Sequence, residues 1–100
     1  MAENLTKSSF DPHLNDKFEV NTDIHGAVEL ELVEVSEHNR DNLECFSLLF
    51  KGPKDKLFDQ KLYKVVHTQM GEFSLFLVPV VHPKQDAVYY ESVFNRLIEK

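Results

Sequence analysis

One cysteine and five histidines are the residues of this sequence best suited to chemistry. A thiolate can act as a nucleophile, and an imidazole can carry protons or bind a metal. A nucleophilic cysteine needs a neighbouring base and an exposed, electropositive setting. Cys45 instead opens a nearly continuous apolar run, so we interpret it as an inert buried thiol. A single cysteine also excludes an internal disulfide and a cysteine-rich zinc site.

The histidines are scattered along the chain, at His13, His25, His38, His67 and His82. No two of them have the two- to four-residue spacing by which one element presents a pair of metal ligands. The sequence therefore predicts no metal and no cofactor; a site assembled across strands is the alternative, which no spacing in the sequence supports. His67 lies in an expected strand near a turn, and we select His67 with Tyr63 as a candidate polar site. We favour the alternative that His67 is a partly buried histidine whose ring satisfies a turn.

Two further segments are candidates for a site. The acids Glu29, Glu31, Glu34 and Glu37 could supply a catalytic pair, but Glu29 and Glu31 alternate with apolar residues and are best explained as a solvated outer face. The segment Lys51–Lys61 surrounds an apolar pair with lysines. That pair can fold back as a lid, which we favour, or anchor a partner. The candidate interaction residues are Lys54, Lys56, Leu57 and Phe58.

Alternation of apolar and polar residues predicts an all-β domain over residues 1–100. A short helical lead-in, residues 1–16, precedes about six mostly antiparallel strands that form a small sandwich or a partly closed barrel. The expected strands are Lys17–Asn21, one starting at Ala27, Leu43–Lys51, Leu62–Met70, Phe73–Val81 and Val88–Asn95. We expect a β-bulge near Leu32-Val33, where the alternation slips by one residue.

Two strands are unusually apolar. Leu43–Lys51 leaves almost no polar face, which predicts a central strand covered on both sides. Phe73–Val81 must be buried within the sheet or covered by a partner, and Pro79, which lacks an N–H, predicts an edge or a bulge there. An exposed apolar strand favours an oligomer.

The 100 residues carry 17 acids and 11 bases, a formal charge of −6 that argues against binding nucleic acid or an anionic membrane. Residues 1–50 hold 11 acids and 3 bases, whereas residues 51–100 hold 6 acids and 8 bases. We expect the two halves to interleave in space; the alternative is a polar molecule that stacks head to tail with its own copies. No secretory pattern begins the chain, and the longest apolar run, residues 75–81, is too short to cross a bilayer. A cytoplasmic protein is expected.

Much of the chain resembles a small bacterial family catalogued as a domain of unknown function. The resemblance is carried by Phe46–Pro53, Gln60–His67, Gly71–Val80 and Tyr89–Arg96, with Leu5, Thr6, Phe10, Leu14 and Phe18 at the start. The turn Gln60–Tyr63 departs from the Gln-Gly-Thr-Tyr of many members. The resemblance implies one β-domain with no assigned catalytic residue. It also associates the family with phage-tail-collar-type proteins.

The sequence thus predicts a noncatalytic structural or protein-interaction module. Its expected partner is a copy of itself or another protein, with a phage-tail-like assembly as its setting. The alternative is a small hydrolase or a ligand-binding barrel whose site forms only in three dimensions.

Overall fold

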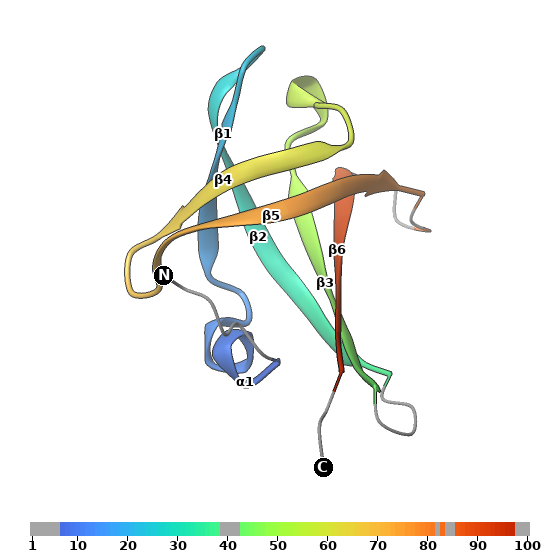
Figure 1. Cartoon of the computed structure of the whole chain (residues 1–100). Helices are drawn as coiled ribbons and strands as arrows, with labels where there is room; N and C mark the ends of the chain where they lie inside the picture. The colour runs from blue at the N-terminus through green and yellow to red at the C-terminus, as the bar shows by residue number, and fades with distance from the viewer. Residues whose placement is uncertain (1–6, 39–42, 82, 84–85, 98–100) are drawn as a thin grey trace.

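The structure is a computed structural model that describes residues 7–38, 43–81, 83 and 86–97. Six strands follow one short helical lead-in, as the sequence predicts (Figure 1). The described part of the lead-in, residues 7–16, contains α1 (Lys7–Phe10) and the 3-10 turn η1 (Asp11–His13). The strands are β1 (Lys17–Thr22), β2 (Gly26–Glu37), β3 (Leu43–Gly52), β4 (Lys61–His67), β5 (Gly71–Val80) and β6 (Val88–Leu97), with the 3-10 turn η2 (Lys54–Lys56) between β3 and β4.

The strands close into an antiparallel barrel in the order β1-β2-β3-β6-β5-β4, with β4 paired back to β1. This order decides between the sandwich and the barrel. Closure between β5 and β6 is short, because β5 pairs with β4 up to Leu77 and with β6 only over Val78–Val80. Pro79 therefore lies where β5 has one paired neighbour, so its missing N–H costs no ladder hydrogen bond on the β4 side.

Side chains alternate between the barrel interior and its outer surface. On β5, Phe73, Leu75 and Leu77 are buried, whereas Phe76 faces outward. Burial within the barrel therefore accounts only for the inward side chains of β5, and cover of its outer face by a partner stays a prediction. On β3 the inward residues are buried and the outward ones are half-buried, so the strand is central but not fully covered on its outer face.

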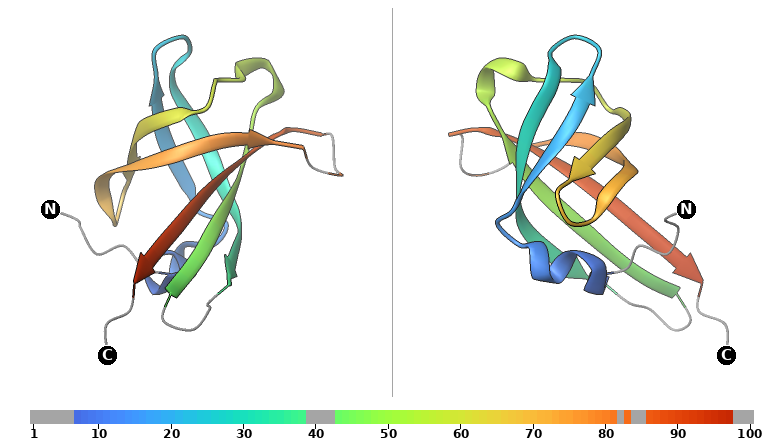
Figure 2. Two further views of the ribbon diagram at one scale, coloured as in Figure 1. Left: turned by 45° about the vertical axis from the view of Figure 1, so that its right-hand side comes forward. Right: turned by 90° about the vertical axis from the view of Figure 1, so that its left-hand side faces the viewer.

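The lead-in covers one end of the barrel, below β1 and β2 in Figure 2. Phe10 carries the contact, since its side chain is completely buried among aromatic rings from four strands. Its ring centroid lies 5.9–6.4 Å from those of Phe18, Phe46, Phe73 and Phe94. Phe10 thus plugs the barrel end and joins strands that are distant in sequence.

Local sequence signals place the bends of the barrel. The register of β2 against β3 shifts between Leu32 and Glu34, which confirms the predicted bulge. Gly26 and Gly71 begin β2 and β5 with φ values of 66° and 83°, which a residue with a Cβ adopts only with strain. β4 ends at His67 and not at Met70 as the sequence predicted.

The strand order also separates the charges. β1, β2 and β3 are consecutive in the barrel wall, and β6, β5 and β4 form the rest. The two halves of the sequence do not alternate strand by strand, but they are joined along two seams, where β3 pairs with β6 over ten positions and β1 with β4 over three. The first three strands carry the acids Glu19, Glu29, Glu31, Glu34, Glu37 and Glu44 against the bases Lys17 and Lys51. Among residues whose side chains are described, the other three carry Lys61, Lys64, Glu72 and Glu91.

Candidate functional site

His67 is a buried histidine at the C-terminal end of β4, with its side chain only 2% exposed. Its ring packs on Phe18, with the two ring centroids 4.5 Å apart. The backbone N–H groups of Gln69 and Met70 both donate to His67 Nδ1 at 3.1 Å. These two amides are hydrogen-bonded to the ring and not to a neighbouring strand, so β4 ends at His67 and the chain turns into β5.

The other ring nitrogen of His67 reaches the lead-in. His67 Nε2 lies 2.9 Å from Oδ2 of Asp16, and His13 Nδ1 lies 3.0 Å from the same oxygen. We call His13, Asp16 and His67 the His-Asp-His cluster. The hydrogen bond from His67, followed by that from His13, holds the pKa of the Asp16 carboxyl below its usual value.

Local backbone geometry positions Asp16. Asn15 adopts a φ of 75°, and its N–H donates to the carbonyl of Leu32 at 2.6 Å. The Leu32 N–H donates in return to the carbonyl of Asp16 at 3.1 Å. The carboxylate of Asp16 is therefore anchored through its own backbone to β2 and aimed at β4.

The cluster has the composition of a metal site but the wrong proton arrangement. Its ligand atoms lie within 4.8 Å of one another. However, Nδ1 of His67 accepts two N–H groups and must be unprotonated, so the proton of the neutral ring sits on Nε2. A metal bound at Nε2 would require Nδ1 to carry that proton, as in ordinary metal-bound histidine. The two backbone donors exclude this tautomer, so the residues do not fit a divalent metal.

The cluster borders a surface groove of about 430 Å³. The groove is lined by Asp16, Lys17, Glu19, Glu29, Val66, His67, Thr68 and Gln69. Glu19 and Glu29 are directly opposite each other on β1 and β2, which is an unfavourable like-charge pair. Asp16 orients His13 through Nδ1, the arrangement by which a carboxylate orients a general base, but no cysteine or serine lines the groove to serve as its nucleophile among the described residues.

Sequence reasoning selected His67 but missed its partners. Asp16 was not singled out, and His13 was treated only as one of five scattered histidines. The available signal was the three-residue spacing of His13 and Asp16 beside an asparagine, a residue that tolerates positive φ. The contact with His67 spans 51 residues and left no local trace.

Tyr63 lies on the same inward face of β4 as His67, four residues away, which is about 13 Å along a strand. The two residues therefore belong to different environments. Tyr63 donates its hydroxyl to the carbonyl of Asp59 at 2.6 Å, and burial raises the pKa of its phenol. The structure does not bring Tyr63 and His67 together as one polar site.

The segment between β3 and β4 divides its two apolar residues between core and solvent. Phe58 is 1% exposed, stacks on Tyr90 with ring centroids 4.2 Å apart, and meets Tyr63 edge-on. It folds back as a lid and is not free to anchor a partner in this conformation. Leu57 remains half exposed, and its carbonyl accepts a hydrogen bond from His25 Nε2 at 3.0 Å.

Among the remaining candidates from the sequence, Glu29 lines the groove beside the cluster. Lys54 and Lys56 are on the surface in η2, and their role as interaction residues stays a prediction. Cys45 is half-buried on β3 and not buried as predicted, because it lies on the outward face of the strand. Glu29 faces solvent as expected, whereas Glu31 is half-buried.

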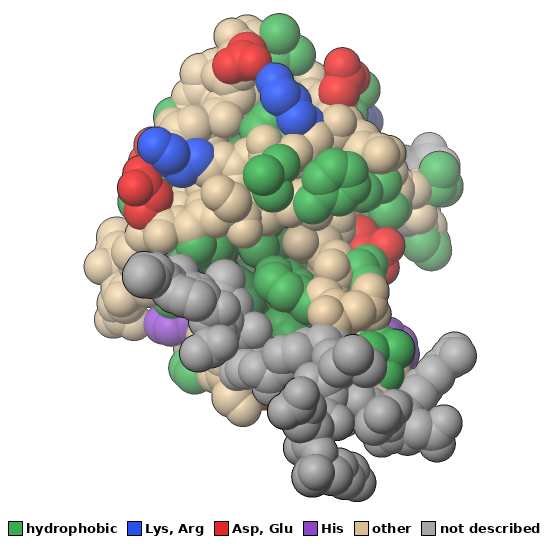
Figure 3. Space-filling model, in the orientation of Figure 1, with side chains coloured by type: hydrophobic (Ala, Val, Ile, Leu, Met, Phe, Trp, Pro, Cys, Tyr) green, Lys and Arg blue, Asp and Glu red, His purple; other side chains and the backbone are tan. Residues whose placement is uncertain are grey.

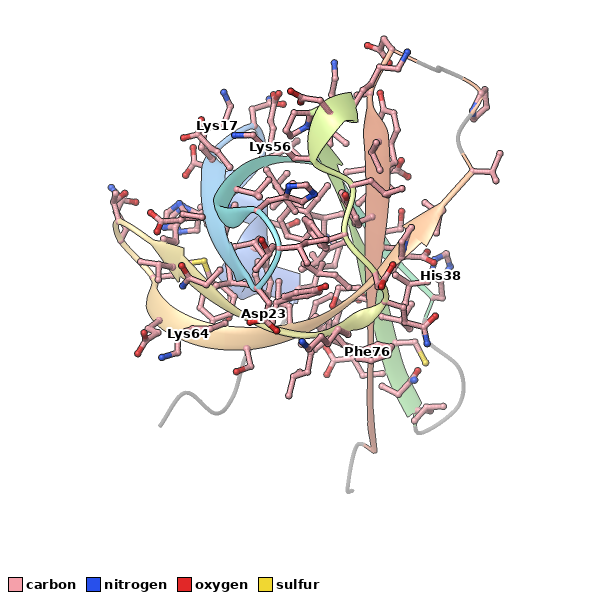
Figure 4. All side chains as sticks on the ribbon, turned by 90° about the horizontal axis from the view of Figure 1, so that it is seen from above. Lys17, Asp23, His38, Lys56, Lys64 and Phe76 are labelled. Carbon is pink, nitrogen blue, oxygen red and sulfur yellow. The ribbon has the colours of Figure 1, made fainter. Side chains whose placement is uncertain are left out.

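Four apolar side chains lie together on the outer surface of β4 and β5. The sequence did not show that they share one face of the barrel. Leu62 and Phe76 are paired across these strands and are 61% and 47% exposed. Val78 and Val80 continue the outward face of β5 and are half-buried. Figure 3 shows hydrophobic side chains gathered over this face, and Figure 4 shows Phe76 on the side of the barrel away from Lys17. We call these four residues the β4–β5 strip.

Comparison with known proteins assigns the chain to a family but does not assign an activity to it. No curated protein and no solved structure matches this chain. No helix within the described part of the chain is long and apolar enough to span a membrane. A family model described as a domain of unknown function (DUF6916) matches residues 5–94, which is nearly the whole chain, and the protein therefore belongs to this family.

Proposed function

We propose that this protein is a noncatalytic structural or interaction module that assembles with copies of itself through the β4–β5 strip. The observation that carries the proposal is the cross-strand pair Leu62 and Phe76, which presents apolar area where an outer barrel face ordinarily presents polar side chains.

The barrel interior supports a structural role over a ligand-binding one. The inward side chains of all six strands form one buried apolar cluster, with Phe10 at one end and Phe58 on its wall. A six-stranded barrel has room inside only for its own side chains. A ligand would therefore have to bind on the surface.

The charged residues beside the β4–β5 strip favour a second copy of this protein as the partner that contacts the strip. Two exposed ion pairs flank it, Lys64 with Glu72 at 3.4 Å and Lys61 with Asp23 at 2.8 Å. Each pair offers one charge of each sign, so a two-fold related copy meets complementary charges. Most of the net negative charge lies on β1–β3, and contact through β4 and β5 leaves those acidic faces apart.

A phage-tail-like assembly is the setting we propose for this self-association. The support for it is the family resemblance and the presence of an apolar strip on a barrel with a filled interior. Repeated copies of one small domain are the components from which closed rings and filaments are built.

Light scattering and sedimentation over a wide range of protein concentration test the self-association. We expect the protein to exceed its monomer mass and the double variant Leu62→Ser, Phe76→Ser to be a monomer. Ile24→Ser is the matched control, because Ile24 is a similarly exposed apolar residue in the β1–β2 turn.

Circular dichroism should give the same spectrum for all three proteins, because the substituted side chains lie on the surface. A protein that is monomeric at every concentration, or a control that dissociates as fully as the double variant, would contradict the proposal.

A further inference from the structure

β6 has a strand on both sides over only part of its length. It pairs with β3 along its whole length, at ten consecutive positions without a shift of register. It pairs with β5 only at Tyr89, Tyr90 and Glu91, and the rest of β5 diverges from it toward β4 (Figure 1). Within the described part of the chain, residues 92–97 therefore have a neighbouring strand on one side only. We call their other side the β6 edge.

The β6 edge presents main-chain groups that no described strand pairs. In an antiparallel strand, the N–H and C=O groups of alternate residues point to the same side, so about half of those in residues 92–97 point away from β3. An extended chain laid along the edge can satisfy these groups with its own main chain. The edge therefore recognises an extended backbone, and the side chains beside it decide which sequences are accepted.

The side chains beside this edge are uncharged and partly apolar. Proteins commonly protect a free edge with a charge, a proline or a bulge, and residues 92–95, Ser-Val-Phe-Asn, have none of these. Val93 faces outward and is 57% exposed. Phe94 lies on the inward face and is half-buried, with its ring stacked on Phe46 at a centroid distance of 4.5 Å. Apolar side chains thus lie on both faces of the strand at its edge.

We propose that the β6 edge binds an extended, uncharged apolar segment of another protein, which adds a strand to the barrel wall. The main chain of the segment pairs with residues 92–97. Its side chains alternate between the two faces, so one set packs on Val93 outside and the other on Phe94 inside.

The length of the edge favours a single segment over a second copy of this protein. β5 bounds the edge at Glu91, so only residues 92–97 remain, which is about 20 Å of strand. With a sheet thickness of about 10 Å, such an edge offers about 200 Å² to a flat partner. A stable interface between two globular copies buries about 800 Å² on each. An extended segment needs no more than the width of one strand.

Titration with a short peptide of alternating valine and threonine, with a lysine at each end for solubility, tests the site by nuclear magnetic resonance. We expect the peptide to bind and to protect amides of residues 92–97 from exchange. The same peptide with its valines and threonines N-methylated is the first control. It keeps the side chains but lacks the N–H groups that a strand neighbour donates, so it should not bind.

A variant of the edge and a matched control give a second measurement. Val93→Lys places a charge beside the bound strand and should weaken peptide binding by more than about tenfold. Val81→Lys changes another exposed valine, which lies just after β5, and should bind the peptide as the unmodified protein does. Circular dichroism should be unchanged in both variants, because both side chains are exposed.

Equal binding of the two peptides overturns the proposal, and so does the absence of binding at about millimolar peptide, because main-chain pairing depends little on the partner's sequence. Amides of residues 92–97 that become protected as protein concentration rises, without peptide, also overturn it, since the occupant is then a second copy. The variant Leu62→Ser, Phe76→Ser should still bind the peptide. A failure of self-association through the β4–β5 strip therefore leaves this result unaffected.

Discussion

Tyr90 holds Phe58 in the barrel by two different contacts. The two rings stack with an interplanar angle of 8°, and the Tyr90 hydroxyl accepts a hydrogen bond from the Phe58 N–H at 3.3 Å. Burial raises the pKa of the Tyr90 phenol, so the hydroxyl stays neutral. Side chain and backbone of the segment between β3 and β4 are thus fastened to one residue of β6.

Removing only the hydroxyl tests the second contact. Tyr90→Phe keeps the stacked ring and leaves the buried Phe58 N–H without its acceptor, which should cost about 1–3 kcal/mol. Urea unfolding measures the loss, and exchange of the Phe58 amide should accelerate more than that of amides in β2. An unchanged Phe58 amide would show that the hydroxyl does not hold the segment.

Alanine substitutions at Phe58 and Leu57 compare the buried and the exposed apolar residue of this segment. Phe58→Ala should destabilise the fold by about 3–5 kcal/mol, because it removes a fully buried ring. Leu57→Ala removes a half-exposed side chain and should cost less than about 1 kcal/mol. Unfolding free energies compare the two variants. A larger loss in Leu57→Ala would contradict the assignment of Phe58 as the lid.

Phe10, which plugs the barrel end, should contribute as much to the free energy of unfolding as a core residue of a strand. Phe10→Ala removes a ring that touches aromatic residues of four strands, and we expect a loss of about 3–5 kcal/mol. Leu14→Ala, in the same lead-in but exposed, is the control and should change stability little. Similar thermal midpoints for the two variants would mean that the lead-in does not close the barrel.

Asp16 should make stability depend on pH in the acid range. Its folded-state pKa is depressed, so its contribution is present above the usual carboxyl value of about 4 and is lost as pH falls through the lower folded value. Asp16→Asn should be less stable than the parent at neutral pH and should approach it in strong acid. Thermal midpoints measured at a series of pH values test this. Parallel curves for both proteins would contradict it.

The proton arrangement of His67 predicts no stabilisation by divalent metals. Zn²⁺ or Ni²⁺ in excess should leave the thermal midpoint unchanged, because a ligand of the native state raises stability only in proportion to its binding. A rise in the midpoint that is abolished by His13→Asn would show instead that the His-Asp-His cluster rearranges to hold the ion.

Local patterns predicted the strands, because alternation and turn residues act over a few neighbouring positions. The bulge at Leu32 could be predicted because a slip of one residue changes which face is apolar. The end of β4 could not, since a side-chain ring at His67 captures the amides that would have extended the strand.

The sequence by itself determined the all-β class, the six strands and the two glycine turns, all of which depend on local conformational preference and on burial of one face. Only the tertiary structure decided the closure of the barrel, the plug of Phe10 and the meeting of Asp16 with His67. These contacts join residues far apart in the chain, and no local preference encodes which distant partner a side chain will meet. The same holds for the β4–β5 strip: alternation shows that Phe76 faces one side of its strand, but strand order decides that Leu62 lies beside it on the outside.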